Sequence, residues 1–162
     1  MKLFLIRHAK SSWEDFTLED FLRPLNKRGL KDASFMAKLL KEKNIKPDLI
    51  ICSPSVRTKL TSEFFIKELD FENEIIFEKA IYEAPFEKLK KVLNNIDDKY
   101  KTIFLIGHNP GLCDLANSLC KDYFENIPTC GIVEIDFDTN SWKNIQKENS
   151  KLICFEYPKK YK

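Results

Sequence analysis

The chain has 162 residues, 43% of them hydrophobic, and its 27 basic and 25 acidic residues give a formal net charge of +2. This length supplies one well-filled core and is short for two, so we expect a single domain over residues 1–162. The charge balance without a basic stripe argues against a nucleic-acid partner. No apolar run approaches the roughly 20 residues of a membrane helix, so we expect no membrane partner.

The cysteines indicate the compartment. There are five of them, an odd number, and none forms a C-x-x-C pair. This usage is typical of reduced, mostly buried thiols rather than of a disulfide framework or a zinc site. Residues 1–6, apolar apart from Lys2, meet Arg7 and His8 too early to form the core of a signal peptide. We therefore expect a cytoplasmic protein.

Short apolar runs alternate with amphipathic stretches along the chain, which predicts an α/β sandwich with a mainly parallel sheet. Strands are expected over residues 3–6, 49–52, 75–77, 102–106, 132–137 and 152–155. Helices are expected over about residues 26–43 and 53–69, from residue 85, and from the turn at residues 109–111. The apolar face is expected to comprise Phe35, Met36, Leu39 and Leu40 in the first helix, and Val56, Leu60 and Phe64 in the second.

Two segments lack a clear period. Residues 10–24 are polar, and their Trp13, Phe16 and Phe21 indicate a loop that packs back on the body of the protein. The lysine-rich residues 159–162 are expected to be a solvated tail.

The chemistry-bearing residues collect after predicted strands. The sequence has only two histidines, His8 and His108, and each follows the carboxyl end of a strand. In a parallel sheet those ends share one edge, where ligands bind. Arg7 adjoins His8, and Arg57 lies in the first turn of a helix, where free N–H groups and the helix dipole favour an anion. Two arginines and two histidines around one anion-binding position are typical of a phosphate site.

Each of these residues also has a purely structural interpretation. A lone histidine at a strand end is more often a hydrogen-bonded structural residue than a nucleophile, and only the combination with Arg7 and Arg57 reverses that expectation. Arg23 is explained equally well by pairing with Asp20 or another acid of its loop. Asn109 and Ser53 suit turn and helix-cap positions.

Five motifs resemble the histidine phosphatase superfamily, and within it the SixA-type phosphohistidine phosphatases. In chain order they are Leu5–Trp13, Arg23–Gly29, Ser53–Thr58, Gly107–Gly111 and Ile127–Thr129. Ala9 departs from the glycine that the wider superfamily usually has. The resemblance implies a phosphoglycerate mutase-like, three-layer α/β/α sandwich. Because the chain has no large lid insertions, the pocket is expected to be shallow and open.

The resemblance also implies roles for residues. His8 would attack phosphorus and carry a covalent phosphoryl group. Arg7, Arg57 and a protonated His108 would bind the phosphoryl oxygens, with Asn109 beside them, while Arg23 and Ser53 would orient the substrate. Neither a metal nor another cofactor is expected, because the cations are built into the chain.

The general acid stays open between Asp20, near Arg23, and Glu83, at a predicted strand end. A departing imidazole has a far lower pKa than an alkoxide, so a phosphohistidine substrate needs acid catalysis less.

The resemblance implies hydrolysis of phosphohistidine on a partner protein, for example a phosphotransfer domain. Two alternatives use the same site: a phosphomonoesterase acting on a small phosphate ester, and a module that binds phosphohistidine or phosphate without turnover. A substrate panel distinguishes all three.

Overall fold

The computed structural model describes all 162 residues, and its centre is one six-stranded sheet in the order β3-β2-β4-β1-β5-β6. The strands are β1 (Lys2–Arg7), β2 (Leu49–Cys52), β3 (Ile75–Phe77), β4 (Thr102–Gly107), β5 (Ile132–Phe137) and β6 (Ser150–Glu156). The first four are parallel to one another, whereas β5 runs antiparallel to β1 and β6 antiparallel to β5. All six predicted strands are confirmed, and the sheet is mainly parallel.

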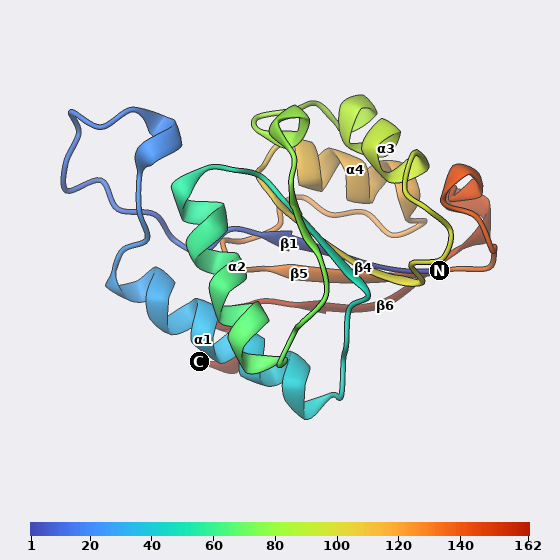
Figure 1. Cartoon of the computed structure of the whole chain (residues 1–162), viewed down its shortest axis with the longest axis horizontal. Helices are drawn as coiled ribbons and strands as arrows, with labels where there is room; N and C mark the ends of the chain where they lie inside the picture. The colour runs from blue at the N-terminus through green and yellow to red at the C-terminus, as the bar shows by residue number, and fades with distance from the viewer.

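Four helices cover the two faces of the sheet, which gives the expected three layers (Figure 1). They are α1 (Lys27–Glu42) and α2 (Val56–Glu68) on one face, and α3 (Phe86–Asn94) and α4 (Gly111–Leu119) on the other. None of them combines the length and the apolar character that crossing a bilayer would require. The fold is phosphoglycerate mutase-like and has no large insertions, as the resemblance implied.

The core is divided by the sheet, because successive side chains of a strand point to opposite faces. Leu3 and Leu5 belong to a cluster of 23 buried residues packed against α3 and α4. Phe4 and Ile6 belong to a cluster of 16 buried residues under α1 and α2. All four side chains are fully buried. A strand covered on both faces reads in the sequence as a continuous apolar run, which is why β1 could be predicted.

The predicted faces of α1 and α2 are partly wrong. In α1, Met36 and Leu40 are buried as expected, but Phe35 is 41% exposed. In α2 the buried residues are Arg57, Thr58, Thr61, Ser62 and Phe65, whereas the predicted Val56, Leu60 and Phe64 are only partly buried. The α2 hydroxyls can be buried because backbone carbonyls of the same segment accept their hydrogen bonds. A periodicity search that counts only apolar residues misses such a face.

The loop after β1 stands away from the body instead of packing back on it (Figure 1). Phe16 is 86% exposed, so the expectation for this residue is wrong. Trp13 is 65% exposed, but its ring packs against the guanidinium of the buried Arg23, whose Cζ lies 3.7 Å from the ring centroid. Phe21 packs inward, edge-on to the ring of Tyr82 at a centroid distance of 5.1 Å. The inward contact lies in the short 3-10 helix η1 (Asp20–Leu22) at the end of the loop.

The lysine-rich end is also not a free tail. Residues Pro158–Tyr161 form a 3-10 turn that packs on α1. The rings of Tyr161 and Phe35 lie 5.4 Å apart, and Lys162 Nζ lies 3.1 Å from Asp32 Oδ1. The partner surface of Phe35 is therefore this turn rather than the sheet.

The five cysteines are all unpaired, and four of them are buried. This agrees with the prediction of mostly buried, reduced thiols. Burial raises the pKa of each, most strongly for Cys130 in the second core cluster. These thiols act as small apolar side chains.

Candidate active site

The two histidines meet because their strands are neighbours in register. Arg7, the last residue of β1, pairs with Gly107, the last residue of β4, so His8 and His108 follow at the same edge. Their ring centroids are 5.3 Å apart. The carboxyl ends of β1, β2 and β4 thus lie together at one edge of the sheet, where the sequence predicted a ligand site.

Arg57 joins both histidines. It is the second residue of α2, and Ser55 caps that helix by accepting a hydrogen bond from Thr58 N. Its Nε lies 3.3 Å from His8 Nε2, and its Nη2 lies 3.2 Å from His108 Nδ1. A guanidinium only donates, so each of these ring nitrogens presents a lone pair.

His8 is held as a neutral ring with one defined tautomer. Its Nδ1 lies 2.7 Å from the carbonyl oxygen of Ala9. A carbonyl can only accept, so Nδ1 carries the hydrogen and Nε2 the lone pair. Burial, followed by the positive field of Arg57, lowers the pKa of His8 to about 3. At neutral pH the Nε2 atom is therefore an unprotonated nitrogen surrounded by cations.

His108 is neutral as well. Its Nδ1 accepts from Arg57, so its Nε2 donates to Ser53 Oγ at 2.7 Å. Burial and Arg57 lower the pKa of His108 to about 4, so the protonated form expected from the resemblance is not the form favoured in this arrangement. Ser53 is fully buried. It is placed to orient His108, and its predicted role in orienting the substrate stays a prediction.

Arg7 has one donor without a partner. Its Nη1 donates to the carbonyl oxygen of Ile127 at 2.9 Å, whereas its Nε is buried and unpaired. Asn109 also donates to Ile127 O, and its Nδ2 reaches Asn126 Oδ1 too, both at 2.9 Å. The Nδ2 group of Asn109 is thus engaged with the segment before β5, and its role as a phosphate ligand stays a prediction.

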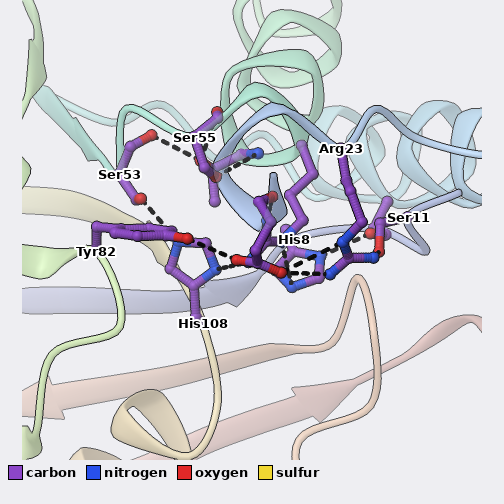
Figure 2. A network of polar contacts seen from close by, with 11 residues as sticks. His8, Ser11, Arg23, Ser53, Ser55, Tyr82 and His108 are labelled. Atoms are coloured by element: carbon purple, nitrogen blue, oxygen red, sulfur yellow. Dashed lines mark hydrogen bonds and ion pairs between the residues drawn. The ribbon is translucent and has the colours of Figure 1, made fainter. Parts of the chain in front are cut away.

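The carboxylate of Asp20 pairs with two arginines of the site, Arg57 and Arg23. Asp20 Oδ2 accepts from Arg57 Nη2 at 2.9 Å and from the Tyr82 hydroxyl at 2.6 Å. Its Oδ1 lies 2.8 Å from Arg23 Nη2, so Arg23 makes the ion pair that its structural interpretation predicted. Arg23 also donates to Ser11 at 2.5 Å. Figure 2 shows Tyr82 and Arg23 at opposite ends of this network, with His108 and His8 between them.

Asp20 neutralises part of the positive charge of the site. Burial disfavours its ionised form, but the hydrogen bonds from Tyr82, Arg23 and Arg57 outweigh burial and hold the pKa of Asp20 well below its usual range. The backbone carbonyl of Asp20 accepts from Arg57 Nη1 at 2.6 Å as well. His8 and His108 are only 7% and 5% exposed. The site is therefore more enclosed than the shallow, open pocket that we expected.

The two candidate acids are placed differently. Asp20 lies in the network, whereas Glu83 is exposed, has a φ of 49° and takes no part in the side-chain hydrogen bonds. The charge of Glu83 still acts on Tyr82, whose pKa rises to about 12 through burial, Asp20 and Glu83. Of the two carboxyl groups, only Asp20 contacts the cations.

Sequence reasoning missed Tyr82 and Thr61. The ring of Tyr82 stands edge-on to His108 at 5.3 Å and covers it. Thr61 Oγ1 accepts from Ala9 N at 3.0 Å and donates to Arg57 O at 2.7 Å, which fixes the segment after β1 to α2. A signal for Tyr82 existed, since it directly precedes the candidate acid Glu83. Thr61 had none, because its role depends on the docking of α2.

Comparison with known proteins identifies the family. The model of the histidine phosphatase superfamily (branch 1) matches residues 3–109, which include β1 with His8, the α2 start with Arg57, and β4 with His108. The chain belongs to this superfamily. An uncharacterized chloroplastic protein of Arabidopsis thaliana is 33% identical to it over 151 residues, which cover 88% of this chain and 69% of that protein.

Solved SixA structures share the whole fold of this histidine phosphatase. The proposed phosphohistidine phosphatase SixA from Agrobacterium tumefaciens is 26% identical, with a TM-score of 0.82 over 97% of this chain and 98% of its own. The protein histidine phosphatase SixA complexed with tungstate is 19% identical, with a TM-score of 0.86 over 100% of both chains. The second likeness concerns the fold alone.

Proposed function

We propose that this chain is a phosphatase that hydrolyses phosphohistidine on a partner protein through a covalent phosphoryl intermediate on His8. The observation that carries the proposal is the state of His8. Its Nδ1 hydrogen is fixed on Ala9 O, and its Nε2 lone pair faces the guanidinium of Arg57. A neutral imidazole nitrogen among buried cations is suited to attack an anionic phosphoryl group. The SixA-like fold supports the phosphohistidine substrate.

Binding would begin with an exchange of anions. Arg57 now donates two N–H groups to Asp20, and Arg7 Nε has no partner. Phosphoryl oxygens carry more charge than one carboxylate and fit the planar forks of both arginines. The substrate would therefore displace Asp20 from Arg57, and Arg57 Nε would turn from His8 Nε2 to a phosphoryl oxygen. This step frees the lone pair of His8.

The first transfer would then be a displacement at phosphorus. The His8 Nε2 lone pair forms the new N–P bond, and the N–P bond to the substrate imidazole breaks with its electron pair on the departing nitrogen. That nitrogen takes a proton from Asp20, Glu83, the Tyr82 hydroxyl or water. Water next attacks phosphorus and gives up a proton, so phosphate leaves and His8 regains its lone pair. Arg7 and Arg57 stabilise the charge spread over the equatorial oxygens in both transfers.

His108 would respond to the bound dianion. Its low pKa arises from burial and from Arg57, and a phosphoryl group would oppose both effects by adding negative charge. Protonation of Nδ1 would then give a further donor to phosphorus-bound oxygen, while Ser53 keeps the ring oriented. The protonated His108 of the family chemistry is thus proposed for the complex with substrate only.

The proposal also includes the compartment. Five unpaired thiols and no disulfide suit a reducing environment, so we place the protein in the cytoplasm. Localisation of a tagged full-length chain tests this directly.

The decisive experiment compares substrates for one enzyme. Wild-type protein is assayed on a phosphohistidine-bearing phosphotransfer domain, on phosphoimidazole, and on a panel of small phosphate esters, with His8→Asn as the control. We expect the highest kcat/KM on the phosphoprotein and no turnover by His8→Asn. Preference for one small ester would support the phosphomonoesterase alternative instead. Stoichiometric binding of the phosphoprotein without hydrolysis would support the third alternative, a module that binds phosphohistidine without turnover.

A further inference from the structure

A basic pocket of about 390 Å³ adjoins the site and begins at Arg7. It lies between the start of α1, the segment before β5 and the C-terminal turn. The side chains that give it its charge are Arg7, Lys10, Arg28, Lys159 and Lys162, and the one acidic residue in its lining is Asp32.

The fold assembles this pocket from distant segments. Lys10 follows His8 by two residues, and its carbonyl oxygen accepts from Asn26 N, which holds the start of α1 beside it. Lys159 and Lys162 come from the other end of the chain. They are brought here by the packing of Tyr161 on Phe35 of α1. The ordered C-terminal turn thus extends the site of His8 by a second surface.

The positive charge of the pocket is not balanced within the protein. Asp32 is 5% exposed, and its carboxylate lies 3.1 Å from Lys162 Nζ and 3.8 Å from Arg28 Nε. This single carboxylate serves both partners. Lys10 and Lys159 take part in none of the ion pairs of the structure, and Arg7 Nε is unpaired. Anions from outside can therefore pair with Lys10 and Lys159 without displacing an internal partner.

We propose that this pocket binds carboxylate side chains of the partner protein that lie beside its phosphorylated residue. The inference rests on the proposed function and adds a recognition surface to it. Arg7 belongs to both places, so a phosphoryl group on His8 and an acidic side chain in the pocket would both lie near its guanidinium.

A protein surface fits the pocket better than a second phosphate of a small molecule. The buried Asp32 lies in the lining, and it would repel a compact dianion that entered deeply. The lysines Lys159 and Lys162 are exposed and long, so they form a broad positive rim. Such a rim pairs with carboxylates spread over a surface, and it accelerates encounter through long-range attraction.

The test uses the full chain with Lys10→Gln and Lys159→Gln combined. The matched control is Lys88→Gln with Lys91→Gln, which removes the same charge from exposed positions of α3 on the other face of the sheet. The substrates are one phosphohistidine peptide with Asp and Glu flanks, its Asn and Gln counterpart, and phosphoimidazole. The unphosphorylated acidic peptide measures binding without turnover.

We expect the pocket variant to raise KM for the acidic peptide about tenfold, as the loss of two ion pairs allows, with kcat unchanged. The neutral peptide and phosphoimidazole should be unaffected, and so should the control variant on every substrate. Binding of the unphosphorylated acidic peptide should weaken in parallel and decline with added salt.

Equal KM values for wild type and pocket variant on the acidic peptide would overturn the inference, while turnover of phosphohistidine would leave the proposed function intact. A KM increase for phosphoimidazole would assign the pocket to small phosphates and also overturn it. If wild type hydrolyses no phosphohistidine substrate, the proposed function fails. In that case the binding assay tests the pocket separately. Salt-sensitive binding of the unphosphorylated acidic peptide that is lost in the pocket variant would support the pocket, and equal binding by both proteins would overturn it.

Discussion

The low pKa of His8 and its fixed tautomer both follow from the position of its backbone at the end of β1. The ring lies under neighbouring segments, so burial opposes its charge, and the adjacent carbonyl of Ala9 is within reach of Nδ1. A nucleophile that stays unprotonated needs no separate base to prepare it. Burial therefore contributes to reactivity here and lowers stability in acid.

The cost of buried neutral histidines should be measurable. The folded pKa values of His8 and His108, about 3 and about 4, lie below the ordinary value of 6.5. At pH values between the folded pKa and 6.5, each histidine is protonated in the unfolded chain and neutral in the folded chain. The free energy of unfolding therefore falls as the pH drops below 6.5. The slope approaches about 1.4 kcal/mol per pH unit for each histidine.

Urea titrations from pH 7 to pH 5 check this, because carboxylates with ordinary pKa values titrate mostly below that window. The double variant His8→Asn with His108→Asn leaves no histidine, and it should show a much flatter dependence. Parallel slopes for wild type and this variant would contradict the account.

Arg57 is expected to act through the shape of its guanidinium as well as its charge. Arg57→Ala should lower kcat/KM by about a thousandfold, because the fork contacts both histidines and would bind the phosphoryl group. Arg57→Lys should recover only part of the loss, since a point charge cannot donate in several fixed directions. Steady-state kinetics on phosphoimidazole measure both. Equal activity of the lysine variant and wild type would reduce the arginine to a simple charge.

Single residues differ in how far the sequence could place them. His8 and His108 were predictable because each ends a strand that is unmistakably apolar, and parallel register then brings them together. Ser53 was predicted to orient the substrate and Asn109 to bind phosphate, and their partners within the protein, His108 and Ile127, are known only once the chain is folded. The role of Tyr82 likewise depends on the placement of η1.

At the level of elements, η1 carries the Asp20 carboxylate to Arg57, where phosphate is expected to bind. If the same carboxyl group, once displaced and protonated, is the general acid, Asp20→Asn should slow alkyl phosphate hydrolysis far more than phosphohistidine hydrolysis. The reason is that an alkoxide needs a proton to leave and an imidazole needs it less. Comparison of kcat on the two substrates measures this, with Glu83→Gln beside it.

The Asp20→Asn variant has a second expected effect. Removal of the competing carboxylate should make inorganic phosphate a stronger inhibitor, because the Arg57 donors no longer pair with an internal charge. If phosphate inhibition is unchanged, Asp20 does not compete with the ligand. If neither acid variant depends on the leaving group, the proton comes from Tyr82, water or the substrate.

The join between the His8 segment and α1 depends on Gly29. A Cβ at that position would lie 2.1 Å from the carbonyl oxygen of Lys10, a backbone atom that cannot move aside cheaply. Gly29→Ala should therefore destabilise the protein by about 2 kcal/mol. Gly107→Ala is the matched control, because its Cβ would meet only Leu112 at 3.6 Å. Urea midpoints compare the two, and equal stability of both variants would refute the close approach.

On the scale of the whole molecule, the sheet and its helices were predictable, and the outer surfaces were not. Strands such as β4 are covered on both faces, so their composition alone identifies them. The side of α2 that faces inward is polar, and its burial depends on hydroxyl hydrogen bonds that no periodicity reveals. Phe16, which is 86% exposed, shows the converse: it is an aromatic side chain that the fold leaves in solvent.

The basic pocket is a property of the whole fold in the same sense. The near-neutral sequence shows no stripe of charge, yet the meeting of Lys10 with Lys159 and Lys162 concentrates positive charge next to Arg7. Sequence analysis could exclude a large basic face, but it could not detect charges brought together from both ends of the chain.

The central claim is that His8 accepts the phosphoryl group, and trapping the intermediate with an alkaline quench tests it most directly. Wild-type protein is mixed with phosphoimidazole, denatured rapidly in alkali during turnover, and its peptides are analysed by mass spectrometry. The account predicts one phosphate on the His8 imidazole, stable in base and lost in acid, and none in His8→Asn. Phosphate on a serine, aspartate or cysteine, or steady turnover by His8→Asn, would contradict it.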